Sequence, residues 1–175
     1  MEEKVILVDK DDKEVGLMNK QEAHVKGLLH RAFSIFIFNS KNELLLQQRA
    51  YEKYHSAGLW TNTCCSHPRH GESLLDAANR RLDEEMGMKC DLRKSFDFIY
   101  SAKMPNDLIE HEYDHVFFGF SDVLPQINKY EVVSYKYMTL SDIKNQIELN
   151  GSLFTEWFKI CFDEVYKRNK LITHG

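Results

Sequence analysis

A change of hydrophobic period near residue 72 constrains the fold of this chain more than any other feature. Before it, residues 31–38 and 43–48 have the aliphatic and aromatic content of strands, and residues 39–42 form a hairpin loop between them. After it, apolar residues recur at helical spacing as Leu74, Leu75, Ala78, Leu82 and Met86, and Gly87 follows as a helix stop. The chain therefore combines strands with at least one amphipathic helix over residues 72–86.

The rest of the chain continues this mixture. We predict strands at 5–8, 60–65, 92–100, 112–120 and 131–138, a loop at 51–59, and closing helices at 141–149 and 152–167. The last helix should bury one face, formed by Leu153, Trp157, Ile160, Cys161 and Val165. Strands with interspersed helices and hairpins indicate a mixed α/β sandwich rather than a parallel βαβ array. The length of 175 residues suits a single domain over 1–175.

Composition excludes several classes of function. Hydrophobic residues make up 43% of the chain, enough for a core, and the net charge of −4 without a long basic run argues against a nucleic-acid partner. The longest apolar run, near residues 32–38, is too short to cross a bilayer, and the acidic start does not resemble a signal peptide. We therefore expect a cytoplasmic protein with no membrane partner. Its four cysteines should be free thiols in a reducing compartment.

Histidines and glutamates suggest a metal centre. His24 and His30 precede the first strong strand, and His67 lies in a Cys-Ser-His-Pro segment. Glu110 and Glu112 would point to the same face of a strand, where they repel each other unless they are solvated or share a cation. Such a nitrogen and oxygen shell suits zinc, manganese or magnesium. The spacing alone also fits a solvated strand edge with scattered surface histidines.

The predicted helix carries a second acidic pattern. Glu72, Arg80, Leu82, Glu84, Glu85, Gly87 and Met88 resemble a degenerate Nudix box, in which glutamates face a metal-bound diphosphate. Ser66 replaces the leading glycine of that motif, and Arg81 replaces the glutamate after Arg80, which weakens the case for hydrolysis. Glu85 can hold Mg²⁺ that bridges two phosphates, with Arg81 one turn earlier on the same face. A charged, solvated helix face has the same spacing.

Two further segments carry a family resemblance. Residues 58–68 read Gly-Leu-Trp-Thr-Asn-Thr-Cys-Cys-Ser-His-Pro and residues 110–112 read Glu-His-Glu. They resemble the two signature regions of type 1 isopentenyl diphosphate isomerases, and residues 29–34, 48–50 and 154–158 fit the same family in the same order. The resemblance implies a Nudix-like α/β/α sandwich with a mixed β-sheet. It also implies interconversion of isopentenyl and dimethylallyl diphosphate in isoprenoid biosynthesis, by protonation and deprotonation through a tertiary carbocation.

The resemblance also implies roles for individual residues. The catalytic set is Cys65, Glu112, Tyr100 and Trp157, and the substrate-binding set is Lys20, Arg49, Lys53 and Arg81. The metal set is His24, His30, His67, Glu110 and Glu112 for one Mn²⁺, Zn²⁺ or Mg²⁺, together with Glu85 for the Mg²⁺ of the substrate diphosphate. We expect a small prenyl diphosphate as the only ligand partner and a monomer or weak dimer.

Two alternatives belong to other functional classes. A Nudix hydrolase of nucleoside diphosphate derivatives would need a complete glutamate box, against which Ser66 and Arg81 argue. A non-catalytic zinc module would close its coordination shell without a proton donor beside it. Cys65, Tyr100 and Glu112 favour catalysis over both.

Overall fold

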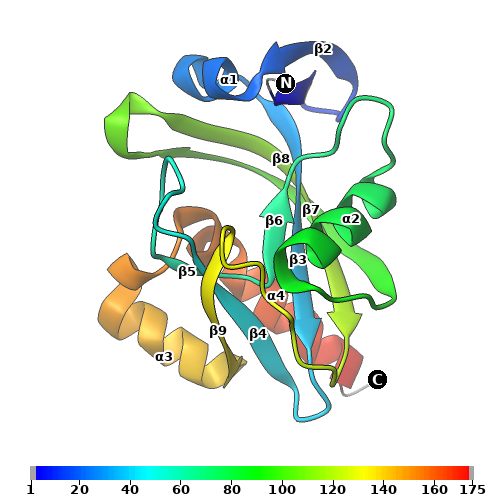
Figure 1. The fold of residues 1–175 in the computed structure, drawn as a ribbon, viewed down its shortest axis with the longest axis vertical. Helices are drawn as coiled ribbons and strands as arrows, with labels where there is room; N and C mark the ends of the chain where they lie inside the picture. Colours follow the sequence, from blue (N-terminus) through cyan, green and yellow to red (C-terminus); the bar gives the residue numbers. More distant parts are fainter. Residues whose placement is uncertain (1–2, 174–175) are drawn as a thin grey trace.

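The computed structural model describes residues 3–173 as a nine-stranded sheet with helices on both faces (Figure 1). The strands are β1 Lys4–Val8, β2 Glu14–Asn19, β3 His30–Phe38, β4 Glu43–Arg49, β5 Trp60–Thr61, β6 Cys64–Ser66, β7 Leu92–Lys103, β8 Ile109–Phe120 and β9 Val132–Thr139. The helices are α1 Lys20–Lys26, α2 Leu74–Met86, α3 Leu140–Asn150 and α4 Glu156–Thr173, with short 3₁₀ turns at Pro105–Asp107 and Gly151–Leu153.

Strand β3 organises the sheet. It pairs in parallel with β8, with His30 opposite Glu112, and antiparallel with β6, with Ser34 opposite Cys65. Strands β7 and β8 form a long hairpin, and β4 pairs antiparallel with β5 and β9. The mixture of parallel and antiparallel pairs confirms the mixed sheet predicted from the sequence.

Alternate side chains of β3 enter two separate cores. Phe33 and Ile35 pack in the core beneath α2, whereas Phe36 and Phe38 pack in the core that contains α3 and α4. Figure 1 shows α2 in front of the sheet and α4 behind it. Because strand side chains alternate between faces, one apolar run supplies both layers. The predicted α/β/α sandwich is therefore confirmed.

Helix α2 has the ends that its sequence predicts. The Ser73 side chain accepts a hydrogen bond from the Asp76 backbone N–H at 3.1 Å and caps the first turn. Gly87 ends the helix with a φ of 59°, and a Cβ there would lie 2.5 Å from the Gln126 carbonyl oxygen. The expected start at residue 72 is wrong by two residues, and Leu75 is exposed rather than buried.

Other sequence expectations need correction. The strand expected at 60–65 is divided into β5 and β6, because Asn62 and Thr63 turn their side chains inward to bond the backbone of β3 at Ile35 and Ile37. Strand β2 and helix α1 were not predicted. On the last helix Trp157, Cys161 and Val165 are buried as expected, whereas Leu153 precedes the helix and is half exposed, as is Ile160. Within residues 3–173 no helix is both long and apolar enough to cross a bilayer.

Candidate active site

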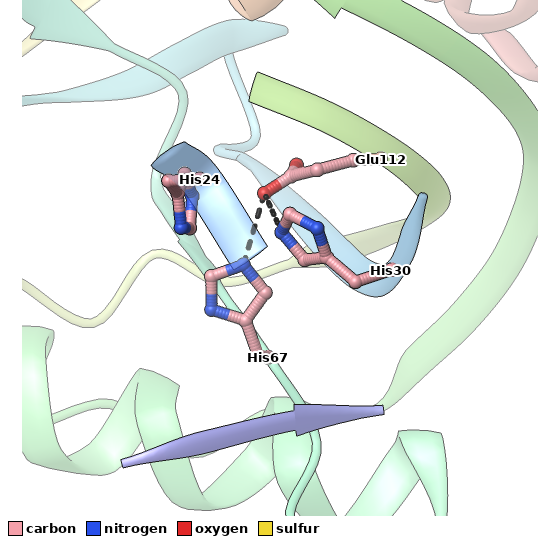
Figure 2. Close-up of side chains that lie close together, drawn as sticks. All are labelled: His24, His30, His67 and Glu112. Carbon is pink, nitrogen blue, oxygen red and sulfur yellow. Dashed lines mark hydrogen bonds and ion pairs between the residues drawn. The ribbon is translucent and has the colours of Figure 1, made fainter. Parts of the chain in front are cut away.

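Three histidines and a glutamate from four elements converge at one end of the sheet (Figure 2). His24 lies on α1, His30 begins β3, His67 follows β6, and Glu112 lies on β8. One nitrogen or oxygen atom from each lies within 4.8 Å of the others. We call this group, together with Glu110, the histidine end of the site.

Helix α1 brings His24 to this group. Gly27 ends the helix in the left-handed region with a φ of 64°, and a Cβ there would lie only 3.1 Å from the Ile109 side chain. A glycine therefore permits α1 to seat closely against the start of β8. The His24 Nε2 atom then lies 3.2 Å from Glu110 Oε2.

Backbone hydrogen bonds set the orientation of two imidazoles. The Nδ1–H of His24 donates to the Lys20 carbonyl oxygen at 2.6 Å, and the Nδ1–H of His30 donates to the Leu28 carbonyl oxygen at 2.8 Å. In the neutral tautomer each Nε2 therefore carries a lone pair, and neither Nε2 has a hydrogen-bond partner although both are buried. A histidine whose other nitrogen is held by a carbonyl is the usual form of a metal ligand.

Glu112 is the centre of the group. Its Oε1 lies 2.9 Å from His67 Nε2 and 3.5 Å from His30 Nε2, and its Oε2 accepts a hydrogen bond from the Tyr100 hydroxyl at 2.7 Å. Figure 2 shows both histidines directed at the same carboxylate oxygen. Burial opposes ionisation of Glu112, but the contacts of this carboxylate with the His30 and His67 imidazoles outweigh it and hold its pKa well below the usual range. Glu112 is therefore a buried carboxylate anion.

The histidine end fits a divalent cation. Burial opposes ionisation of Glu110 as well, and so does the Glu112 charge, but contacts with His24 and His55 hold the pKa of Glu110 below its usual value. Two buried carboxylates thus share a site with two imidazole nitrogens that have no hydrogen-bond partner, and the Oε2 atom of Glu110 has none either. Mixed nitrogen and oxygen donors of this kind suit first-row divalent metals. Four of the five residues predicted as ligands lie together in one set, and Glu110 contacts that set through His24.

Sequence reasoning missed His55. It lies in the loop between β4 and β5, is 7% exposed, and its Nε2 is 2.8 Å from Glu110 Oε1. With His24 and Glu110 it forms a second set of atoms within 4.8 Å of one another. The loop has no hydrophobic period and no motif, so the only available signal was one more histidine in a chain that contains eight.

Asp114 extends the row of carboxylates on β8. The Ser34 hydroxyl donates to its Oδ2 at 2.7 Å, and its Oδ1 has no partner although it is buried. Burial and the Glu112 charge raise the pKa of Asp114 well above its usual value. The environment of Asp114 thus disfavours its ionisation, whereas the environments of Glu110 and Glu112 favour theirs.

A cleft of about 760 Å³ opens beside the histidine end. Cys65, Tyr100 and Trp157 line it together with Glu110 and Glu112. Burial raises the pKa of the Cys65 thiol to about 12, and burial together with Glu112 raises the pKa of Tyr100 well above its usual value. Both groups therefore carry their protons at neutral pH and face the same cleft as an anionic carboxylate.

The strands also explain why only one of two adjacent cysteines reaches the cleft. Cys64 is fully buried in the core beneath α2, whereas Cys65 packs on the opposite face of the sheet, against the core that contains α4. Trp157 reaches the cleft because the start of α4 is tied to β5, where the Thr155 backbone N–H donates to the Trp60 carbonyl oxygen at 3.0 Å.

The cleft lining also contains a group of cations. Lys20, Arg49, Lys53 and Arg81, the four residues predicted to bind phosphate, all line it. We call these four residues the cation end. The Lys20 and Lys53 side chains are each 25% exposed, and Arg49 lies over the Trp157 ring with its guanidinium carbon 5.2 Å from the ring centroid.

Carboxylates already occupy part of the cation end. Arg81 pairs with Glu85, and Lys53 pairs with Glu131, which also lies 3.5 Å from Arg81. The other oxygen of Glu85 accepts a hydrogen bond from the Gln47 side chain at 2.8 Å. Glu131 was not identified from the sequence, because it lies in a turn before β9 outside any motif.

The glutamates of the Nudix-like segment have two different roles. One stabilises the fold, and another lines the cleft. Glu72 accepts hydrogen bonds from Arg80 Nε at 2.6 Å and Nη2 at 2.9 Å, which fastens the preceding loop to α2. Glu85 alone among the motif glutamates lines the cleft, with Arg81 beside it. The face predicted to contact diphosphate is therefore the face that reaches the cleft.

Comparison with known proteins agrees with this architecture. The family model described as the NUDIX domain matches residues 28–158. Solved structures with the same fold include a Deinococcus radiodurans protein, with a TM-score of 0.71 at 19% identity over 85% of this chain and 90% of that one. Another is a MutT protein from Methanosarcina mazei, with a TM-score of 0.67 at 20% identity over 81% and 96% of the two chains. Fold and site thus define a NUDIX domain.

Curated relatives define the family within that class. A protein of Pectobacterium atrosepticum named isopentenyl-diphosphate Delta-isomerase is 55% identical over 92% of this chain and 90% of its own length. A Gibberella zeae protein with the same enzyme name is 43% identical over 91% of this chain and 72% of its own. The chain belongs to the isopentenyl-diphosphate Delta-isomerase family, as the sequence motifs predicted.

Proposed function

We propose that the protein interconverts isopentenyl and dimethylallyl diphosphate with Cys65 and Glu112 as its acid and base. The isomerase activity follows from membership of the family, whose curated relatives carry that enzyme name. The residue roles are our proposal, and one observation carries them. The buried carboxylate of Glu112 contacts both His67 and Tyr100, in a cleft that Cys65 and Trp157 also line.

The reaction needs two proton transfers. A proton from the enzyme forms a C–H bond at the terminal alkene carbon, using the π electron pair, and leaves a tertiary carbocation. A base then removes a proton from the neighbouring methylene, whose C–H electron pair becomes the new double bond. Cys65 and Glu112 form the acid–base pair, and the Tyr100 hydroxyl, 2.7 Å from Glu112 Oε2, assists transfer at that carboxyl.

The carbocation must be protected from water and stabilised. Trp157 is 4% exposed and lines the cleft, so its ring can face the cation. A desolvated tryptophan face stabilises a cation by about 1–2 kcal/mol. Tyr54 and His55 enclose the same region, with ring centroids 4.5 Å apart.

Two divalent ions complete the proposal. His24, His30, His67, Glu110 and Glu112 would hold one Mn²⁺, Zn²⁺ or Mg²⁺, which supplies positive charge next to Glu112 and makes a proton on that carboxyl more acidic. Glu85 would hold Mg²⁺ together with the substrate diphosphate. The support for the first ion is the convergence of unpaired buried nitrogens on two carboxylates.

The cation end would bind the diphosphate. Lys20, Arg49, Lys53 and Arg81 face the same cleft, and the planar arginine side chains suit two-point contacts with phosphate oxygens. We further propose that the protein acts in the cytoplasm as a monomer or weak dimer. All four cysteines are free, as expected for a reducing compartment.

A turnover assay tests the proposal directly. Metal-loaded protein incubated with isopentenyl diphosphate should produce dimethylallyl diphosphate, and it should approach the same mixture from the other isomer. The activity should depend on Mg²⁺ and be abolished by a chelator. Release of phosphate without exchange of isomers would instead identify a Nudix hydrolase, and metal binding without turnover would identify a non-catalytic metal module.

A further inference from the structure

The loop over residues 50–59 carries a buried histidine, His55, to which the proposed function gives no role at the metal centre. His55 has a side chain that is 5% exposed, although its neighbours Tyr51 and Glu52 are exposed to solvent. Its ring lies 6.0 Å from the Trp157 ring at an angle of 88° and 5.9 Å from the His24 ring. A loop side chain is thus inserted between the catalytic aromatic and the histidine end.

The loop backbone is shaped to hold His55 in that position. The next residue, Ser56, has a φ of 52°, in the left-handed region that few residues other than glycine adopt. The Arg49 guanidinium donates to the His55 carbonyl oxygen at 3.3 Å, and the Ser56 hydroxyl lies 3.2 Å from His55 Nδ1. Unfavourable backbone conformations persist where surrounding contacts fix them, often at functional sites.

The two carboxylate oxygens of Glu110 have different neighbours, and His55 contacts only one of them. Its Nε2 lies 2.8 Å from Oε1, the geometry of a charge-assisted hydrogen bond. The second oxygen, Oε2, lies 3.2 Å from His24 Nε2, is buried, and has no hydrogen-bond partner. The hydrogen bond from His55 therefore fixes the carboxylate with its free oxygen toward the ligand group.

We propose that His55 is a positioning residue of the metal centre, which donates its Nε2–H to Glu110 Oε1 and keeps Oε2 directed at the ion. This inference rests on the proposed function, because it requires an ion at the histidine end. Partners of this kind hold ligating carboxylates in orientation, and their loss costs roughly 10–100-fold in metal affinity. The competing role is direct ligation, since the atoms of His55, His24 and Glu110 lie within 4.8 Å of one another.

The test compares His55→Ala with His55→Gln, whose side-chain amide can still donate to Glu110. His115→Ala is the matched control, because His115 is also buried and its Nε2 lies 2.9 Å from a carboxylate, that of Asp12, outside the cleft. Each variant is titrated with Co²⁺ against a chelating dye at one fixed pH. The visible absorption of bound Co²⁺ then reports the number of ligands, and thermal melts check folding.

We expect His55→Ala to bind Co²⁺ roughly 10–100-fold more weakly than wild type, with an unchanged spectrum at saturation. His55→Gln should recover most of the affinity, and His115→Ala should match wild type. Wild-type affinity in folded His55→Ala would overturn the inference and leave the metal centre intact. An altered Co²⁺ spectrum in both His55 variants would overturn it in favour of direct ligation. A wild-type protein that binds no Co²⁺ would overturn the metal centre itself.

Discussion

The histidine end and the cation end satisfy their charges in opposite ways. At the histidine end, His24 and His30 are fully buried, and their Nε2 atoms have no hydrogen-bond partner beside the carboxylates of Glu110 and Glu112. At the cation end, Lys53 and Arg81 are partly exposed and already paired with Glu131 and Glu85. The histidine end thus has buried nitrogens without hydrogen-bond partners, whereas two cations of the cation end are already paired with carboxylates.

This difference indicates how each end changes when it is filled. An ion at the histidine end gains ligands that are already oriented, because backbone carbonyls fix two imidazoles and the sheet register fixes Glu112. If a diphosphate binds at the cation end, as proposed, it would compete with Glu85 and Glu131 for the same cations. We therefore expect substitutions at the histidine end to have large effects on turnover and metal content, and those at the cation end to have small effects on substrate affinity.

The largest effect in this comparison should come from Cys65→Ala. It removes a proton-bearing group from the cleft, and acid–base groups typically contribute 10²–10⁴-fold, so we expect turnover to fall by roughly a thousandfold. Cys64→Ala is the matched control, because Cys64 lies on the opposite face of the sheet. The measurement is the turnover number of both variants from steady-state kinetics. If Cys64→Ala is the inactive one, the assignment of β6 to the cleft is wrong.

His67→Ala and Glu110→Gln should have the next largest effects on activity. Each removes or neutralises one donor of the histidine end, and we expect metal affinity to fall by roughly 10–100-fold, with activity lost in parallel. His70→Ala is a suitable control, since that side chain is 63% exposed and only three residues away. Elemental analysis after dialysis measures the bound metal. Full occupancy in both variants would remove these residues from the metal site.

Trp157 should give an intermediate effect. Trp157→Phe keeps an aromatic face with a weaker quadrupole, whereas Trp157→Leu keeps apolar packing alone. A stabilisation of about 1–2 kcal/mol corresponds to a loss of roughly tenfold in turnover for the leucine variant, with a smaller loss for phenylalanine. Thermal melts must accompany the kinetics, because Trp157 is also part of the core that contains α4. Equal turnover of Leu and Phe variants at equal stability would make Trp157 a packing residue.

The smallest effect should come from Glu131→Gln at the cation end. Removal of this charge frees Lys53 and Arg81 from a competing anion, so KM for isopentenyl diphosphate should fall. A partly exposed ion pair contributes about 1 kcal/mol, which limits the change to about fivefold, with kcat nearly constant. Glu84→Gln, which removes a more exposed partner of Arg81, serves as the control. A rise in KM would show that Glu131 orders these cations for substrate instead of competing with it.

Hydrophobic periodicity and helix-stop residues predicted those helices and strands that bury one regular apolar face. Helix α2 was predictable because Leu82 and Met86 recur on one side and Gly87 stops the chain. Strand β2 and helix α1 were not, because most of β2 is exposed or half exposed and α1 spans only seven residues. Leu153 and Ile160 match the helical period but are half exposed, since tertiary packing selects a narrower face than the pattern indicates.

The sequence predicted the site residues that lie in recognisable motifs, but it did not predict those that lie in loops. The Cys-Ser-His-Pro and Glu-His-Glu segments pointed to Cys65, His67 and Glu112 because both segments resemble the signature regions of the isomerase family. His55 and Glu131 lie in segments without period or motif. Their positions depend on how the loop after β4 and the turn before β9 fold back over the cleft. Only the tertiary structure contains that information.

Glu112→Gln tests the central claim most directly, because Glu112 contacts both the proposed metal ligand His67 and the proposed catalytic residue Tyr100. The amide keeps the size of the side chain and one oxygen for the ion but cannot cycle a proton. We expect bound metal and affinity for isopentenyl diphosphate to stay close to wild type, while exchange of isomers falls by roughly a thousandfold, as for an interaction used only in the transition state. A Glu112→Gln protein that holds its metal and still interconverts the isomers at more than about a tenth of the wild-type rate would contradict the account.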